Sequence, residues 1–201
     1  MHRCVLLVAF SAWALPLTAQ APAASTRWLA DPAHSSVGFR VRHLGITWVN
    51  GTFHQWSAEL IYDPEHPERA SVAARIAAGS VDTGNERRDN DLRSTYLVTD
   101  SFPEVLFISR RVERDATAPN HLRITGDLTL RGVTHPVVLD AEVGGVLETT
   151  RGRRTAFSAT TAFRRQDYGI TLNHFMEGAQ VVGDEVRITI DLEAVERTTT
   201  P

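Results

Sequence analysis

The sequence predicts an all-β protein built from antiparallel strands. Apolar and polar residues alternate with a period of two through most of the chain, as they do in strands with one face in a core and one face in water. Turn-forming residues separate these stretches at short intervals, which is typical of hairpin connections. About eight strands, each with apolar residues on one face, can bury those faces in a two-sheet sandwich or in a closed barrel. The periodicity favours neither architecture.

The clearest element is a hairpin with strands at 122–130 and 133–143, joined by a turn at Arg131-Gly132. Apolar residues share one parity on each of these strands, and charged residues occupy the other. The other strands are expected, in chain order, at 26–30, 35–43, 56–62, 71–81, 105–114, 155–164 and 185–195.

Two local features bear on the connections and on the interior. Asn50-Gly51 is a favoured turn dipeptide, so we expect a turn or a bulge there. The apolar parity of 71–81 consists largely of small residues, Ala74 among them. Alanine on an inward face of a barrel would leave room for one elongated ligand.

One helix is expected from Asn85 to about Ser94. Thr83 or Asn85 can cap its amino terminus, and Glu86 lies in its first turn. The many charges of this segment are typical of a solvated helix face with mutually paired side chains.

Residues 1–23 resemble a secretory signal peptide. His2 and Arg3 precede an apolar run that ends in small residues, and the run is shorter than the roughly 20 residues of a membrane span. We expect its removal, which leaves 24–201 as a single exported domain, periplasmic or secreted. The only cysteine, Cys4, leaves with it, so disulfides and thiolate chemistry are excluded from the mature chain.

The charge pattern excludes further classes of protein. The chain has a net charge of −3 and contains no lysine. Nucleic-acid binding depends on phosphate neutralisation, so this mildly acidic chain is a poor candidate for it. The absence of lysine also excludes Schiff-base catalysis.

Residues suited to catalysis or metal binding are scattered. No two histidines of the mature chain have the four-residue spacing of a helical zinc site, and no serine stands in a glycine-flanked nucleophile elbow. His34 is expected to bond to backbone or to Asp31, whereas His43 and His54 flank the expected turn. We expect neither a metal site nor catalysis.

Several segments, taken in order, resemble the YceI-like family of exported lipid-binding proteins over roughly 28–195. They are Asp31-Pro32-Ala33-His34-Ser35-Ser36-Val37-Gly38-Phe39, His43-Leu44-Gly45, Gly51-Thr52-Phe53, Val81-Asp82-Thr83, Arg88-Asp89 with Leu92, Phe102-Pro103-Glu104 before Phe107, the run from Gly126 to Thr134, and Arg165-Gln166-Asp167-Tyr168-Gly169-Ile170. The resemblance implies an extended eight-stranded antiparallel β-barrel, similar to a lipocalin, with one short helix. It also implies an apolar lumen that holds an isoprenoid or another long-chain amphiphile, and no other cofactor.

The sequence departs from the family pattern in two places. An aromatic and acidic run is usual between Arg93 and Ser101, whereas residues 94–100 of this chain have a different composition. Tyr168 also replaces the commoner phenylalanine. If the first segment borders the mouth of the lumen, the preference for a lipid head group will differ from that of relatives.

Strand parity and the resemblance together predict the ligand-binding residues. Those of the lumen and its mouth are Phe39, Val41, Phe53, Ala74, Ile76, Leu97, Phe107, Leu128, Leu130 and Phe163. Those near a head group are His43, Arg87, Arg88, Asp89, Arg165 and Asp167. Arginine forks fit phosphate and carboxylate oxygens, although each arginine could instead pair with its neighbouring aspartate and tether the helix or the last hairpin.

We therefore expect a binding protein that carries, stores or sequesters a long-chain lipid in the periplasm. Two alternatives remain: an enzyme acting on an apolar substrate held in the lumen, and an interaction module for a membrane respiratory protein. The sequence also leaves open a homodimer and a membrane protein that donates or accepts the lipid.

Overall fold

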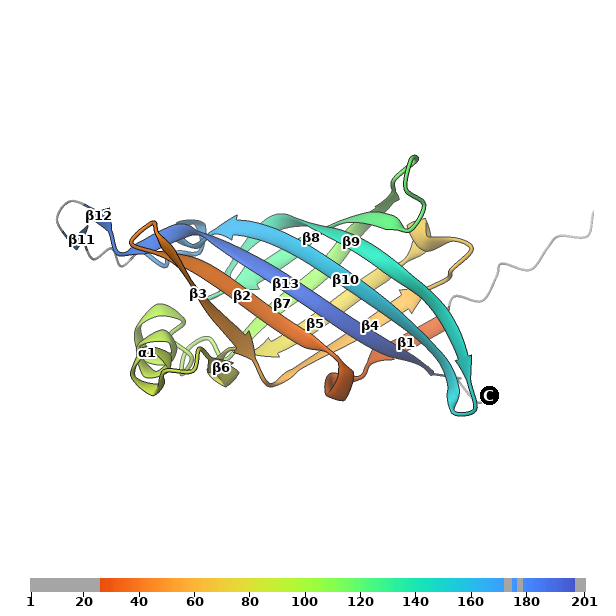
Figure 1. Cartoon of the computed structure of the whole chain (residues 1–201), viewed down its shortest axis with the longest axis horizontal. Helices are drawn as coiled ribbons and strands as arrows, with labels where there is room; N and C mark the ends of the chain where they lie inside the picture. Colours follow the sequence, from red (N-terminus) through yellow and green to blue (C-terminus); the bar gives the residue numbers. More distant parts are fainter. Residues whose placement is uncertain (1–25, 172–174, 177–178, 198–201) are drawn as a thin grey trace, which may run out of the picture.

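The computed structural model describes residues 26–171, 175–176 and 179–197, with 175–176 and 179–180 described as backbone only. These residues form an elongated antiparallel barrel (Figure 1), apart from 175–176 and 179–180, which pair as a separate two-stranded sheet. The strands are β1 (Thr26–Ala30), β2 (Ser36–His43), β3 (Thr47–Phe53), β4 (Trp56–Tyr62), β5 (Ser71–Ala77), β6 (Val81–Asp82), β7 (Glu104–Arg114), β8 (His121–Leu130), β9 (Val133–Thr149), β10 (Gly152–Arg164), β11 (Phe175–Met176), β12 (Ala179–Gln180) and β13 (Val182–Arg197). The helical segments are η1 (Pro32–His34), η2 (Pro67–Arg69), η3 (Ala78–Ser80), α1 (Glu86–Asp91), η4 (Leu92–Tyr96) and η5 (Arg165–Tyr168).

The barrel closes through eight strand positions. Their order is β1-β4-β5-β7-β8-β9-β10-β13, and β1 also pairs with β13. Three of these positions are each occupied by two strands in succession, namely β1 and β2, β4 and β3, and β5 and β6. β2 follows β1 along β13, β3 pairs with β2, and β6 pairs with β3. The expected eight-stranded barrel with one short helix is therefore confirmed, and the sandwich is not formed.

The predicted hairpin of β8 and β9 forms around Arg131-Gly132. Leu130 pairs with Val133, and the two turn residues have φ angles of 52° and 72°. Two left-handed residues make the turn whose twist matches that of the flanking strands, and glycine adopts this conformation without strain.

The predicted turn at Asn50-Gly51 is wrong. Both residues lie inside β3, and the chain instead turns at Leu44 and Gly45, which have φ angles of 52° and 73°. Gly51 pairs with Phe39, and a Cβ atom built on it would lie 2.4 Å from the Phe39 ring. The glycine therefore serves the close approach of an aromatic ring rather than a turn.

The expected strand at 71–81 is interrupted. β5 ends at Ala77, and the fully buried Ala78 donates its amide to the Pro103 carbonyl at 2.8 Å instead of continuing the ladder. The short helix η3 then lets β6 join β3, whereas β5 pairs with β4. The interruption therefore divides the barrel wall into two segments along its length.

The expected helix begins where the sequence places it. The Asn85 side-chain oxygen accepts a hydrogen bond from the Arg88 amide at 3.0 Å, as an N-cap does. α1 is only six residues long and passes into the π-helical turn η4, where the Leu97 amide bonds to the Leu92 carbonyl at 2.8 Å. The predicted end near Ser94 falls inside that turn.

The core is continuous along the barrel but differs between its ends. At the end that carries the described carboxyl terminus, Trp28 and Ala194 are fully buried, and the Trp28 indole donates to the Tyr62 carbonyl at 3.1 Å. At the other end, α1 and η4 connect β6 to β7 (Figure 1).

None of the helices in the described ranges is long and apolar enough to cross a bilayer. The predicted signal peptide lies outside the described residues.

Candidate functional site

Two adjoining cavities lie inside the barrel. The wide chamber has a volume of about 390 Å³ and lies beneath α1 and η4. The narrow chamber has a volume of about 120 Å³ and lies toward the Trp28 end. The two chambers share the wall residues Val37, Ile76, Leu128 and Ile190. They therefore form one lumen with a wide part and a narrow part.

The narrow chamber is enclosed by regular strands. Ala58 pairs with Ala74 across the seam of β4 and β5, and Ala74 pairs with Phe107 on β7. Beyond them, Tyr62 and Phe157 meet edge to face with ring centroids 5.1 Å apart and close the lumen. Aromatic rings therefore close this end of the lumen, and short alanine side chains line the space next to them.

The wide chamber combines strand residues with residues from irregular segments. Phe39 and Phe53 pack with ring centroids 5.5 Å apart on β2 and β3. Leu92 and Leu97 cover the chamber from η4 and the turn after it, and Ile170 follows η5. Polar side chains also line it, and these are Arg42, His43, Thr83, Arg88, Asp91 and Arg165.

Arg165 is a buried cation in the wall of the wide chamber. Its side chain is 2% exposed, and its guanidinium donates to the carbonyl oxygens of Gly183 at 2.9 Å, Val182 at 3.1 Å and Ile170. Carbonyl dipoles compensate part of the cost of burying the charge. The side chain thereby ties η5 to β13 and does not pair with Asp167 among the hydrogen bonds described.

Arg88 and Asp89 hold the loop before α1. The Asp89 carboxylate accepts from the Thr83 amide at 2.9 Å and from its hydroxyl at 2.5 Å. Arg88 donates to the Thr83 hydroxyl at 2.7 Å and to its carbonyl at 2.9 Å. The two charged side chains therefore converge on one threonine, and Arg88 still borders the chamber.

Most of the predicted ligand-binding residues line one of the two chambers. Those that line the wide chamber are Phe39, Val41, Phe53, Ile76, Leu97, Leu128, Leu130 and Phe163, and Ile76 and Leu128 also border the narrow one. Ala74 and Phe107 line the narrow chamber. Among the predicted head-group residues, His43, Arg88 and Arg165 line the wide chamber. Arg87 is exposed, Asp89 is committed to Thr83, and Asp167 lies on an outer groove, so these three are not in the described lining.

Other lining residues were not predicted. Val186 and Ile188 of β13 share the parity of the core, so the alternation could have identified them. Leu92, Tyr96 and Ile170 come from segments without a strand period. The sequence carries no parity signal for such positions.

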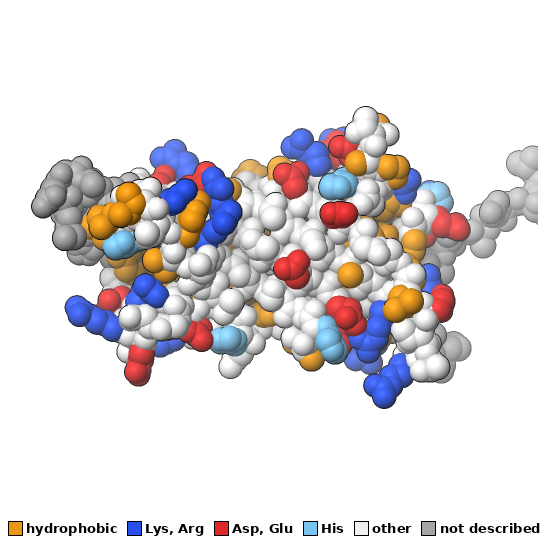
Figure 2. Space-filling view, in the orientation of Figure 1, with side chains coloured by type: hydrophobic (Ala, Val, Ile, Leu, Met, Phe, Trp, Pro, Cys, Tyr) orange, Lys and Arg blue, Asp and Glu red, His pale blue; other side chains and the backbone are white. Residues whose placement is uncertain are grey.

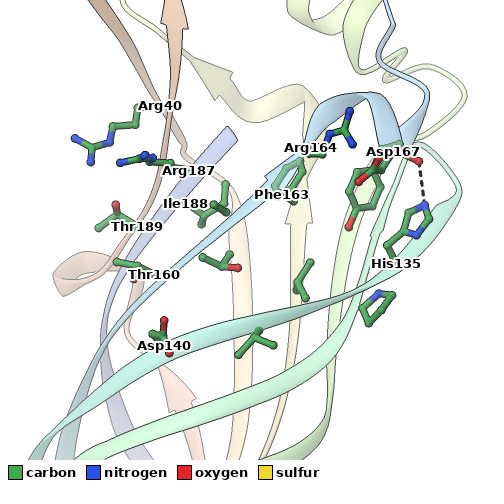
Figure 3. A pocket seen from close by; sticks show the side chains of 16 residues that line it. Arg40, His135, Asp140, Thr160, Phe163, Arg164, Asp167, Arg187, Ile188 and Thr189 are labelled. Carbon is green, nitrogen blue, oxygen red and sulfur yellow. Dashed lines mark hydrogen bonds between the residues drawn. The ribbon is translucent and has the colours of Figure 1, made fainter. Parts of the chain in front are cut away.

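An outer groove of about 920 Å³ lies where the barrel wall opens (Figure 3). The pairing of β9 with β10 stops at Asp140 and Thr160, and the two strands diverge beyond that pair. Phe163 and Ile188 line this groove and also the wide chamber. The wall is therefore about one side chain thick there.

Tyr168 fills the gap between the diverging strands. It is 1% exposed, its ring packs edge to face on Phe163 and His135, and His135 lies 3.0 Å from the Asp167 carbonyl. Its hydroxyl has no hydrogen-bond partner within the described part of the chain. Burial raises the pKa of Tyr168 to about 12.

A polar cluster outside the lumen stabilises the interruption between β1 and β2. Asp31 accepts from the Ala33 amide at 3.1 Å and lies 3.0 Å from the His34 ring, a bond that holds the pKa of the Asp31 carboxyl below its usual range. Glu193 lies close enough to complete a group of metal-binding type. Arg154 donates to both carboxylates, so a cation already lies in this cluster.

These features define a class: a closed antiparallel barrel whose apolar lumen is lined by strand residues and bordered by a few polar groups at one end. Comparison of the sequence with protein families matches residues 28–194 to the YceI-like domain. The chain belongs to this family.

Relatives support the assignment over nearly the whole chain. Protein YceI of Salmonella arizonae is 34% identical over 182 residues, which cover 90% of this chain and 91% of the relative. The crystal structure of the Campylobacter jejuni YceI protein is 32% identical, with a TM-score of 0.66, over 84% of this chain and 96% of that chain. A polyisoprenoid-binding domain from Saccharophagus degradans is 14% identical, with a TM-score of 0.63, over 85% and 98%. This last likeness shows the fold alone.

Proposed function

We propose that this protein binds a long isoprenoid or a similar amphiphilic lipid in its lumen and carries, stores or sequesters it in the periplasm. The observation that carries the proposal is the pair of adjoining chambers, which are lined mainly by apolar side chains and narrow toward one end. A volume of about 390 Å³ lies within the range of small-molecule sites, and the narrow chamber adds length rather than width. An elongated apolar chain matches this shape.

Burial of the chain is sufficient to drive binding. A buried methylene contributes about 0.8 kcal/mol, so a five-carbon isoprene unit contributes at most roughly 4 kcal/mol. Micromolar affinity corresponds to about 8 kcal/mol, and association costs roughly 4–15 kcal/mol. Three to five buried units, as an order of magnitude, would therefore suffice without an ion pair.

The polar groups favour one orientation of the ligand. His43, Arg88 and Arg165 line the wide chamber, whereas the lining of the narrow chamber exposes essentially apolar atoms. We place the head group at the wide end and the tail toward Tyr62 and Phe157. Burying a polar head group at the apolar end would cost its hydration without replacing its hydrogen bonds.

Binding is favoured over catalysis because several described polar groups near the wide chamber form hydrogen bonds that stabilise the fold. Arg88 and Asp89 bond to Thr83, and Arg165 bonds to backbone carbonyls. Groups committed to the fold in this way are poorly placed to transfer protons. The family relationship points in the same direction.

The direct test is an organic extract of protein purified from the exported fraction, examined by mass spectrometry together with the intact complex. We expect a long-chain lipid in stoichiometric amount. The delipidated protein should then bind prenyl alcohols with affinity that rises with chain length and changes little with salt. If the affinity depended on the presence of a phosphate group but not on the length of the prenyl chain, binding through the lumen would be refuted.

A further inference from the structure

The β2–β3 hairpin presents an unusual surface at the wide end of the barrel. Ile46, in its turn, is 76% exposed and is the most exposed large apolar side chain in the described ranges. Trp48 follows two residues later on the outward parity of β3. An aliphatic tip next to an outward-facing tryptophan is a common composition for a segment that enters a membrane interface.

Three arginines surround Trp48. The guanidinium carbons of Arg42, Arg40 and Arg187 lie 4.0, 4.7 and 5.1 Å from the centre of its ring. Arg42 also donates to the Ile46 carbonyl at 3.3 Å, which ties the cationic cluster to the apolar tip. In the space-filling view, basic and apolar side chains meet over this end of the barrel (Figure 2).

The cluster carries charge that the hairpin does not neutralise. Arg187 bonds to Glu185, but Arg40 and Arg42 form no ion pair within the described part of the chain. Arg40 and Arg187 are also direct cross-strand partners, an arrangement that like charges destabilise. From 36 to 58 the sequence contains no carboxylate at all. A phosphate-bearing partner would relieve this repulsion.

We propose that the tip of this hairpin, Leu44 to Trp48 with Arg40, Arg42 and Arg187, docks on the surface of a bilayer rich in anionic phospholipid. The combination of the arginines with the exposed Ile46 favours a membrane over a free phosphate. The arginines attract the phosphates of the surface, and Ile46 gains burial only if an apolar phase lies beneath them.

Docking in this way would place the lumen against the membrane. Val41 and Val49 of the same hairpin line the wide chamber, so the docked tip would lie next to the part of the lumen in which we place the head group. This second step rests on the proposed function, but the docking itself does not.

The test compares flotation of the full protein with vesicles of phosphatidylcholine alone and with vesicles in which about a third of the lipid is phosphatidylglycerol. We expect binding to the anionic vesicles and a loss of binding at high salt. Ile46→Ser should weaken it by about tenfold or more, and Arg40→Gln with Arg42→Gln by about fivefold per arginine. All variants lie at exposed or half-buried positions, and their melting confirms that they fold.

The opposite end of the barrel supplies matched controls. Leu147 is 64% exposed in the β9–β10 hairpin, and Arg123 and Arg151 are exposed and distant from the tip. Leu147→Ser and Arg123→Gln with Arg151→Gln should leave flotation unchanged. Equal losses in the control and test variants, or no preference for anionic vesicles, would overturn the docking proposal. A protein that floats with vesicles but holds no lipid would refute the lumen function and leave the docking intact.

Discussion

The two halves of the lumen are built differently, because aromatic side chains close one end and short helical segments cover the other. Around the narrow chamber, neighbouring strands are paired apart from local register shifts in the β7–β8 and β9–β10 ladders and the step from β1 to β2 along β13. Trp28, Tyr62 and Phe157 fill this end. Around the wide chamber, β5 stops at Ala77, the β9–β10 seam stops at Thr160, and short helical segments cover the gaps. Strand ladders with only local irregularities therefore enclose the small cavity, whereas strands that end and give way to helical segments border the large one.

This contrast teaches where a barrel can admit a ligand. A strand held by neighbours on both sides opens only when much of the sheet opens, whereas a segment with few ladder bonds can move at lower cost. The wide half contains such segments at its rim. We expect ligands to enter there and stability to reside in the narrow half.

The largest expected effect is a difference between two aromatic truncations. Trp28→Ala removes a fully buried indole and its hydrogen bond at the narrow end, and should lower the free energy of unfolding by about 3–5 kcal/mol. Phe53→Ala removes a half-buried ring beside an existing cavity and should cost about 1–2 kcal/mol. Urea unfolding of the delipidated proteins measures both. Equal losses would mean that the two halves are equally rigid.

A second pair of variants separates packing from ligand space. Ala74→Trp forces an indole into the narrow chamber of about 120 Å³, and overpacking should cost about 1–3 kcal/mol. Val41→Trp points into the chamber of about 390 Å³ and should change the free energy of unfolding by less than about 1 kcal/mol.

The same variants should change lipid binding in different ways. Ala74→Trp blocks the far end of the lumen. It should therefore lower the affinity for long prenyl alcohols until it equals the affinity for short ones. Val41→Trp occupies the wide chamber and should weaken binding of every chain length. Titration of a chain-length series decides this. A loss that was independent of chain length in Ala74→Trp would contradict the tail position that we propose.

The same division decides how much the sequence could predict. Around the narrow chamber, alternation was sufficient, since β1 and β4 have the bounds that the pattern predicts. The turn at Arg131-Gly132 was also predicted correctly, although it lies at the wide end, where Leu130 lines the chamber. In the wide half, local signals competed with tertiary contacts. Asn50-Gly51 has a strong turn preference, yet the Phe39 ring requires a residue without a Cβ atom at that point.

The polar rim shows a second limit of sequence reasoning. Arg165 and Asp167 stand two residues apart, which makes an ion pair or a shared head-group site a natural interpretation. In the structure the Arg165 guanidinium bonds to carbonyls of β13 and of the chain after η5, and no side-chain pattern encodes those oxygens. Leu92 and Ile170 are similar cases, because their place in the chamber wall depends on how irregular segments fold over the barrel.

The smallest expected effect concerns the plug of the open seam. The Tyr168 hydroxyl is buried without a partner among the described residues, so Tyr168→Phe should raise the free energy of unfolding at pH 7 by about 1 kcal/mol. The fold raises the pKa of Tyr168 to about 12, above its ordinary value of 10, so it favours the neutral hydroxyl. That contribution is complete below about pH 10 and is lost as the pH rises toward 12. The advantage of Tyr168→Phe should therefore grow between pH 7 and about pH 11, measured by urea unfolding at both values. A variant less stable than wild type at pH 7 would show that the hydroxyl forms a bond that holds the seam together.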